Sequence, residues 1–360
     1  MNRILKSTLL FFVLMGLFSC KKDDSTTSIY VVPYSEQQPV DNAAIVEFLT
    51  NNYFNEEEFD NVGNFDLGVF KYDIKFSEEA TVTGYDSNGD GVIDGSDADD
   101  ITVFNRTPLI DYVNTVINNI TIETKTITVS EVDHILYILK IEQGQGVEKP
   151  RFCDEALLSY EAITLDKNIF DNQLNPIKID LSGTVKGFSE SVSEFNTAAT
   201  AFGDSNGTIT YMDYGVGAVF MPSGLGYYNE SRINIPAYSP LIFKLKVYGA
   251  TELDHDNDDM PTYLEDLNGN HNLSDDDTDS DNSPNYLDSN DDNDPVLTIN
   301  ETIIISYIMD TNLGGTEPVL GSFEFEISRE EISPGEFEIK TRKYIDTDGD
   351  GILDYLDSDS

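Results

Sequence analysis

The stretch Ala218–Gly249, AVFMPSGLGYYNESRINIPAYSPLIFKLKVYG, decides the expected fold of this chain. Its two ends, Ala218–Met221 and Leu241–Val247, are rich in aliphatic and aromatic residues, which suit a pleated, half-buried strand. The loop between them contains proline and glycine, yet it also carries apolar and aromatic side chains where loops are usually polar. These side chains are Tyr227, Tyr228, Ile235 and Tyr238. The residues alone leave open whether this loop fills the core of its own hairpin or lines a pocket.

Several short motifs occur in this stretch and upstream of it. The downstream motifs are Pro222-Ser-Gly-Leu-Gly-Tyr227, Ile235-Pro236 and Leu241-Ile-Phe243. The upstream motifs are Tyr160, Phe170-Asp171, Pro176-Ile-Lys-Ile179 and Gly183-Thr-Val-Lys-Gly-Phe188. In order and nearly in spacing, this set resembles the FKBP-type peptidyl-prolyl isomerases, over residues 135–249. The resemblance implies an α+β fold in which an antiparallel β-sheet wraps on a short helix.

The resemblance also implies an apolar pocket that binds proline. Its walls and floor are expected to be Tyr160, Phe170, Ile177, Val185, Phe188, Ile235 and Phe243, and its polar groups Asp171 and Tyr227. Such a pocket lowers the barrier of roughly 20 kcal/mol by fitting the twisted imide better than the planar one, so no cofactor is expected for catalysis.

Two departures from the family pattern affect this pocket. Phe188 stands where the family usually has tryptophan, and Ile177 stands where an aromatic residue is common. Both keep the pocket apolar but make it shallower, so we expect weak activity. The expected partners are proline-containing segments of exported or surface proteins, and the alternative is a non-catalytic, calcium-loaded surface module that binds peptides.

Two acidic loops have oxygen-bearing side chains at the spacing of an EF-hand-type calcium loop, with a glycine at the sharp turn. The first comprises Asp86, Asn88, Asp90, Asp94 and Asp97; the last comprises Asp346, Asp348, Asp350, Asp354 and Asp357. Between them, residues 254–294 repeat the arrangement in frames that resemble thrombospondin type 3 repeats. These frames are Asp254, Asp256, Asp258 and Glu265; Asp266, Asn268, Asn270 and Asp277; and Asp277, Asp279, Asp281 and Asp288. We expect structural Ca²⁺ there, and the alternative is a disordered acidic linker.

The net charge of the chain excludes one class of binding partner. With 67 acidic and 21 basic residues, the net charge is −46. Binding to nucleic acid depends on lysine and arginine, so nucleic acid is not an expected partner.

The first residues indicate an exported, membrane-anchored protein. Arg3 and Lys6 precede the short apolar run Leu9–Phe18, as in a secretory signal, and the sequence Leu-Phe-Ser-Cys ending at Cys20 resembles the lipobox of bacterial lipoproteins. We therefore expect Cys20 to be lipidated and the protein to be anchored in the bacterial cell envelope, in the outer membrane. Residues 21–24, Lys-Lys-Asp-Asp, resemble the surface-export signals of some Bacteroidota lipoproteins, although an ordinary tether explains them equally well.

The expected organisation follows from these segments. A helix is predicted over residues 43–54, with Asp41 as its cap. The predicted regions are a signal peptide (1–19), a lipidated tether (20–35), an α+β extension with the calcium-type loop 86–97 (36–130), the isomerase domain (131–250), the Asp-rich repeats (251–295) and a β-rich segment ending in a calcium-type loop (296–360).

Overall fold

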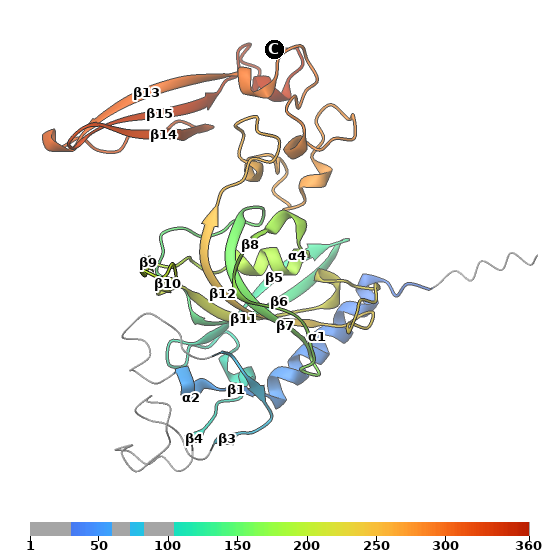
Figure 1. Cartoon of the computed structure of the whole chain (residues 1–360). Helices are drawn as coiled ribbons and strands as arrows, with labels where there is room; N and C mark the ends of the chain where they lie inside the picture. Colours follow the sequence, from blue (N-terminus) through green and yellow to red (C-terminus); the bar gives the residue numbers. More distant parts are fainter. Residues whose placement is uncertain (1–29, 60–72, 83–103, 360) are drawn as a thin grey trace, which may run out of the picture. The chain divides into compact units, whose positions relative to one another are not determined.

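The computed structural model describes residues 30–59, 73–82 and 104–359, and its largest sheet has six antiparallel strands (Figure 1). Across the sheet, the strands are β5 (Thr121–Val129), β6 (Val132–Glu142), β11 (Gly215–Met221), β12 (Leu241–Thr251), β7 (Glu155–Thr164) and β8 (Ile169–Asp180). The two ends of the stretch quoted above are β11 and β12, and Val219 lies opposite Phe243. The predicted antiparallel sheet is therefore confirmed. Strand β5, which precedes the boundary expected at residue 130, is an edge strand of the same sheet.

A helix packs on each face of this sheet and buries its central strands, above all β11. On one face, α1 (Tyr34–Asn51) contributes Ile45, Phe48 and Leu49 to a core with Leu139 and Phe220. On the other, α4 (Lys186–Val192) contributes Phe188 and Val192 to a second core with Ile138, Val219 and Phe243. Neighbouring residues of a strand point to opposite faces, so β6 and β11 serve both cores. Figure 1 shows the strands curving around α4.

Helix α1 begins earlier than predicted, and Asp41 is not its cap. Asp41 lies inside the helix, is 1% exposed, and accepts hydrogen bonds from the backbone nitrogen (2.8 Å) and hydroxyl (2.6 Å) of Ser223. Ser223 begins the loop that leads to Tyr227. The carboxylate therefore joins α1 to that loop, a contact that links residues 182 positions apart.

The buried residue His134 in β6 makes stability sensitive to pH. It is 1% exposed, and neither ring nitrogen has a hydrogen-bond partner among the described residues. Burial disfavours the imidazolium form and outweighs the attraction of Asp41 and Asp133, so the pKa of His134 is lowered. The unfolded chain takes up a proton at about pH 6.5, whereas the folded chain does not.

We therefore expect the free energy of unfolding to fall as the pH drops below about 6.5, by up to about 1.4 kcal/mol per pH unit from this group. Urea unfolding at pH 7.5 and 5.5 measures the effect in wild type and in His134→Leu. The variant should lose less stability than wild type between the two pH values. An equal loss in both proteins would exclude His134 as the cause.

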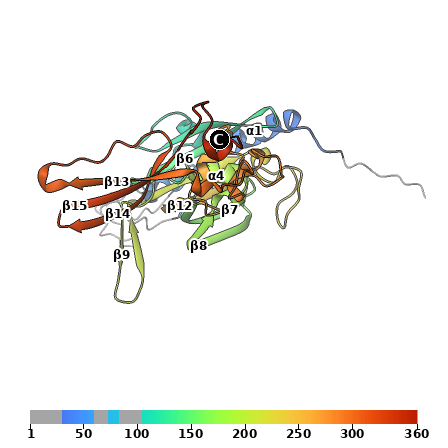
Figure 2. The same cartoon turned by 90° about the horizontal axis from the view of Figure 1, so that it is seen from above.

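The segment between α4 and β11 contains an additional hairpin. Strands β9 (Thr200–Gly203) and β10 (Ile209–Met212) pair antiparallel and form a two-stranded sheet of their own, which Figure 2 shows projecting as a hairpin. In the turn that joins them, Oδ1 of Asp204 accepts hydrogen bonds from the backbone nitrogens of Asn206 and Thr208, each at 2.8 Å.

The remaining N-terminal elements are short. They are β1 (Tyr53–Phe54), α2 (Glu56–Phe59), β2 (Phe76–Ser77), β3 (Thr81–Val82) and β4 (Phe104–Asn105). The calcium-type loop with Asp86, Asn88, Asp90, Asp94 and Asp97 lies outside the described residues, as does Cys20. Among the helices that are described, none has the length and apolar character needed to cross a membrane.

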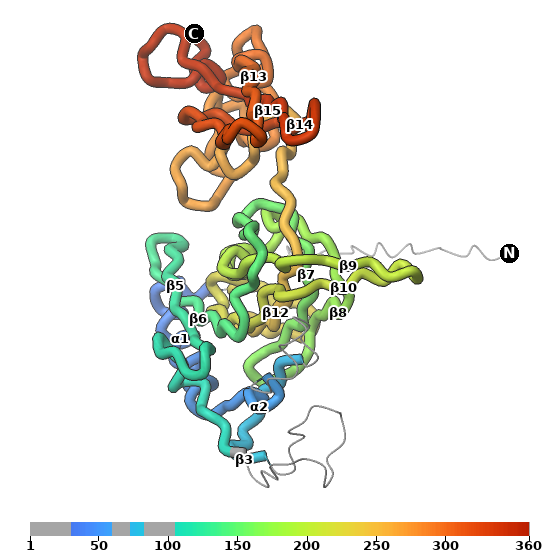
Figure 3. The backbone as a smooth tube through the Cα atoms, turned by 90° about the vertical axis from the view of Figure 1, so that its left-hand side faces the viewer, coloured from blue at the N-terminus to red at the C-terminus, as the bar shows by residue number. Residues whose placement is uncertain are grey.

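After β12 the backbone winds through successive loops with single 3-10 turns (Figure 3). It then forms a three-stranded antiparallel sheet of β13 (Thr302–Asp310), β14 (Glu324–Ser333) and β15 (Glu336–Tyr344). A small core joins these regions, since Met260 of the loops packs with Tyr344 and Tyr355, each at most 1% exposed. The Asp-rich loops thus share a small core with the end of β15 and the C-terminal loop that contains Tyr355.

Candidate functional site

Four aromatic side chains from four elements gather on the face of the large sheet that packs against α4. Phe188 of α4 lies edge-on to Phe243 of β12, with ring centroids 5.0 Å apart. Tyr160 of β7 lies 5.8 Å from Phe188, and Phe170 of β8 lies 5.8 Å from Phe243. The rings form an aromatic box whose floor is Phe188, which is 4% exposed.

Helix α4 can approach the box because of Gly187. A Cβ atom at this position would lie 2.9 Å from the sulfur of Met221 and 3.0 Å from Cβ of Leu225. Real Cβ atoms rarely tolerate such contacts, so any larger residue would push the helix, and Phe188 with it, away from the sheet.

A polar pair stands at the edge of the aromatic box. The hydroxyl of Tyr160 donates a hydrogen bond of 2.6 Å to Oδ2 of Asp171, whose side chain is exposed. Burial and this bond to a carboxylate raise the pKa of Tyr160. Tyr160 therefore remains a protonated donor at neutral pH, and it orients the Asp171 carboxylate toward the open side of the box.

An open hollow adjoins this pair. Its lining includes Phe170, Asp171 and Tyr227, together with Ser231, Arg232, Ile233 and Ile235 of the loop between β11 and β12. The guanidinium of Arg232 lies 5.3 Å from the centre of the Tyr227 ring. Backbone hydrogen bonds between Arg232 and Ile235, of 2.9 and 3.1 Å, hold this part of the loop in a tight turn.

Most of the predicted pocket residues are thus brought together. Val185 caps the start of α4 and packs against the same core, with Tyr227 and Phe170 beside it. Ile177 is half-buried opposite Leu158, and its neighbour Ile179, rather than Ile177, packs against the core around Phe188. Sequence reasoning missed Ser231, Arg232 and Ile233, because the motifs that carry the family resemblance, at Tyr227 and Ile235, fall on either side of them.

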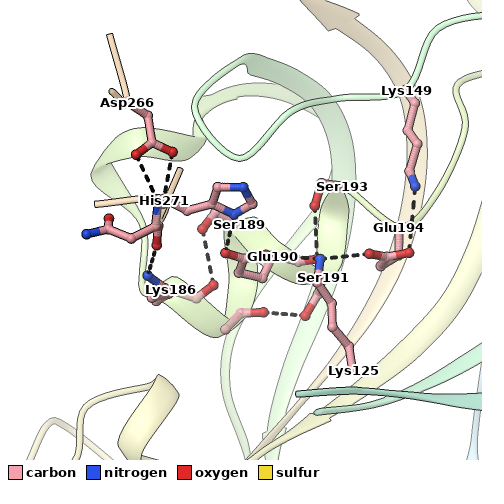
Figure 4. Close-up of polar contacts among 12 residues, drawn as sticks. Lys125, Lys149, Lys186, Ser189, Glu190, Ser191, Ser193, Glu194, Asp266 and His271 are labelled. Atoms are coloured by element: carbon pink, nitrogen blue, oxygen red, sulfur yellow. Dashed lines mark hydrogen bonds and ion pairs between the residues drawn. The ribbon is translucent and has the colours of Figure 1, made fainter. Parts of the chain in front are cut away.

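The Asp-rich loops contact the helix that carries the floor of the box (Figure 4). Nδ1 of His271 lies 2.6 Å from a carboxylate oxygen of Glu190 in α4, and Nζ of Lys186 donates to the carbonyl of Asn270 at 2.8 Å. Lys125 of β5 lies 3.0 Å from Glu190 on its other side. Burial alone would raise the pKa of Glu190, but His271 and Lys125 together lower it. The carboxylate thus stays charged and ties β5, α4 and the loops together.

The acidic residues form four groups within the described part of the chain, and in each the candidate ligand atoms lie within 4.8 Å of one another. The groups are Asp256, Asp258, Glu265 and Asp291; Asp277, Asp279 and Asp281; Asp292, Asp294 and Glu301; and Asp346, Asp348 and Asp350. Asp291, Asp292, Asp294 and Glu301 lay outside every predicted frame.

The other predicted ligand residues make hydrogen bonds within their own loops. Asp254 accepts hydrogen bonds from the backbone nitrogens of Asn257 (2.7 Å) and Asp259 (3.0 Å). The same kind of turn engages Asp266 and Asp288, and the side chains of Asn268 and Asn270 donate to Asp275. Asp354 accepts from Thr347, and Asp357 accepts from the backbone nitrogen of Asp359. Members of the four groups accept similar backbone hydrogen bonds, as Asp346 does from Gly349 and Gly351. Buried oxygens without a hydrogen-bond partner among the described residues occur in three of the groups, those that contain Glu265, Asp277 and Asp292.

The group that contains Glu265 is the most buried of the four. Asp258, Glu265 and Asp291 are each at most 1% exposed, and oxygens of all three lack a hydrogen-bond partner among the described residues. Burial, reinforced by the neighbouring carboxylates, raises the pKa of Glu265 to about 10, that of Asp291 to about 9 and that of Asp258 to about 8. In the absence of a bound cation, burial therefore disfavours the charged form of these three carboxyl groups.

Comparison with known proteins gives partial matches. Residues 255–326 match a family model described as BamM C-terminal. A peptidyl-prolyl cis-trans isomerase from Pseudomonas syringae matches at 16% identity and a TM-score of 0.28, over 36% of this chain and 81% of that one. FkpA from Escherichia coli matches at 22% identity and a TM-score of 0.27, over 35% of this chain and 51% of that one. No curated protein matches the chain.

Proposed function

We propose that the six-stranded sheet and α4 form a peptidyl-prolyl cis-trans isomerase that acts on proline-containing segments of exported or surface polypeptides. The observation that carries this proposal is the aromatic box of Tyr160, Phe170, Phe188 and Phe243. The Tyr160–Asp171 hydrogen bond of 2.6 Å lies at its open edge. An apolar box with one oriented polar pair suits a substrate that is a proline ring joined to a peptide backbone.

The box would act on the imide by differential binding. The proline ring enters against Phe188, which removes water from the imide and so reduces the stabilisation of its planar, charge-separated form. The carboxylate of Asp171 would orient the twisting amide, and the hydroxyl of Tyr227, a residue that lines the adjoining hollow, would donate to a substrate carbonyl. No step requires a nucleophile or a metal ion. Phenylalanine offers a smaller floor than tryptophan, so we expect a slow enzyme.

The proposal includes the setting of the enzyme. Lipidation at Cys20 would anchor the chain to the outer membrane of the bacterial cell envelope. The isomerase would then meet its substrates after export. Ca²⁺ would serve the acidic loops as a structural ion and take no part in catalysis.

Exchange between the cis and trans forms of a proline-containing tetrapeptide tests the activity directly. Uncatalysed exchange takes tens of seconds, and we expect the full chain at micromolar concentration to shorten it measurably. A short peptide is the right substrate because it separates isomerisation from any effect on protein folding. Saturable peptide binding without acceleration would replace the proposed enzyme by a peptide-binding module, and the absence of both would refute the site itself.

A further inference from the structure

We propose that Asp256, Asp258, Glu265 and Asp291 together bind one Ca²⁺ ion, which holds the Asp-rich loops and the C-terminal sheet as a single folded region. This site differs from the predicted frame, because Asp254 is replaced by Asp291, a residue from far along the chain. The proposal is independent of isomerase activity.

The geometry of the four side chains fits a cation. One carboxylate oxygen from each lies within 4.8 Å of the others. Both oxygens of Glu265 and both oxygens of Asp291 lack a hydrogen-bond partner among the described residues, as does one oxygen each of Asp256 and Asp258. Buried carboxylates almost always have a partner, because an unpaired one loses its hydration without compensation. Unpaired oxygens on four side chains that meet at one place indicate a cation-binding site.

The protein itself does not supply that positive charge. Within residues 30–59, 73–82 and 104–359, no ion pair joins a lysine, arginine or histidine to any of these four carboxylates. The pairs next to the site in sequence are Arg342 with Asp259 and His255 with Asp180, and neither includes a member of the site. Among the described residues, the hydrogen bonds to the group come from backbone nitrogens, such as Met260 to Asp258 at 2.7 Å.

The kind of ligand follows from the donor atoms. All are carboxylate oxygens, which suit hard cations, and the group contains neither the imidazole nor the thiolate that zinc favours. Ca²⁺ takes six to eight oxygens in a flexible arrangement and accepts two oxygens from one carboxylate. Mg²⁺ keeps several waters in a strict octahedron, and a site with three side chains at most 1% exposed leaves little space for them.

The position of the site explains what the ion would hold together. Asp258 and Glu265 flank Met260, which packs with Tyr344 at the end of β15 and with Tyr355. Asp291 lies ahead of β13, and its backbone nitrogen donates to the hydroxyl of Thr298 at 3.3 Å. An ion bound to all four carboxylates therefore joins the first Asp-rich loop, the last one and the core beside them.

Calcium binding by the full chain, measured by equilibrium dialysis with radioactive calcium, tests the site. The double variant Glu265→Gln/Asp291→Asn keeps the side-chain shapes and removes two charges, and it should bind one ion fewer per chain than wild type. Glu330→Gln, an exposed change on β14, is the matched control and should bind the wild-type number. Equal stoichiometry in wild type and the double variant would overturn the proposal. Mg²⁺ should compete only at concentrations at least about tenfold higher.

Thermal unfolding in chelator separates a lost site from a misfolded variant. Without calcium, an amide is no more costly to bury here than a crowded carboxyl group, so the double variant should be at least as stable as wild type. With calcium, its Tm should rise less than that of wild type. A double variant that is less stable than wild type in chelator would show that the carboxylates are held by protons and hydrogen bonds, and it would overturn the calcium site.

Discussion

Replacing Asp171 by alanine is expected to lower kcat/KM for Xaa-Pro isomerisation about tenfold and to leave the Tm unchanged. Asp171 is exposed and makes one side-chain hydrogen bond, to Tyr160, so the fold depends on it little. In the site, its carboxylate is the charged group that orients the substrate amide. The loss of one hydrogen bond to a charged group costs about 1.5 kcal/mol or more, which corresponds to about a tenfold change in rate.

Asn172→Ala is the matched control, because Asn172 is exposed on the same strand and its side chain points to the opposite face. The control should keep both the rate and the Tm of wild type. Full activity in Asp171→Ala would remove Asp171 from the mechanism. Phe188→Ala is a poorer test of the box, because Phe188 is 4% exposed and its removal would also cost the fold about 3–5 kcal/mol.

Replacing Tyr355 by alanine is expected to destabilise residues 252–359 by about 3 kcal/mol or more. Tyr355 is 1% exposed, and its ring lies edge-on to that of Tyr344 with centroids 5.1 Å apart. Its core contains only three buried side chains, Met260, Tyr344 and Tyr355, so the loss of one leaves little to hold the region. We expect protease to cut the region much faster than in wild type, while the six-stranded sheet stays protected.

Limited proteolysis followed by mass spectrometry of the fragments measures this effect in calcium-containing buffer. Ile352→Ala is the control, because Ile352 lies in the same loop as Tyr355 but is 46% exposed. Its cleavage pattern should match that of wild type. If Tyr355→Ala were cleaved at the wild-type rate, the small core would not be what holds the region together.

The sequence by itself determined the elements whose signal is local. Strands β11 and β12 follow from continuous apolar runs on either side of a loop, and the order of the motifs from Tyr160 to Phe243 placed most of the aromatic box. Alternation along a strand and the spacing of acidic residues are properties of neighbouring residues, so they can be seen without a fold. The predicted ends of elements differ from the observed ones. Helix α1, for example, begins at Tyr34, well before the predicted start at residue 43.

Only the tertiary structure decided which distant residues meet. Asp41 was predicted to cap a helix, but its carboxylate accepts a hydrogen bond from Ser223. Asp291, and not the predicted Asp254, lies in the acidic group with Glu265. Tyr344 and Tyr355 gave the Asp-rich loops a core that their own composition lacks. Contacts of this kind depend on how loops and strands far apart in sequence pack together. A carboxylate has the same local pattern whether it caps a turn, bonds to a remote serine or faces other carboxylates, because its partner is chosen by the fold.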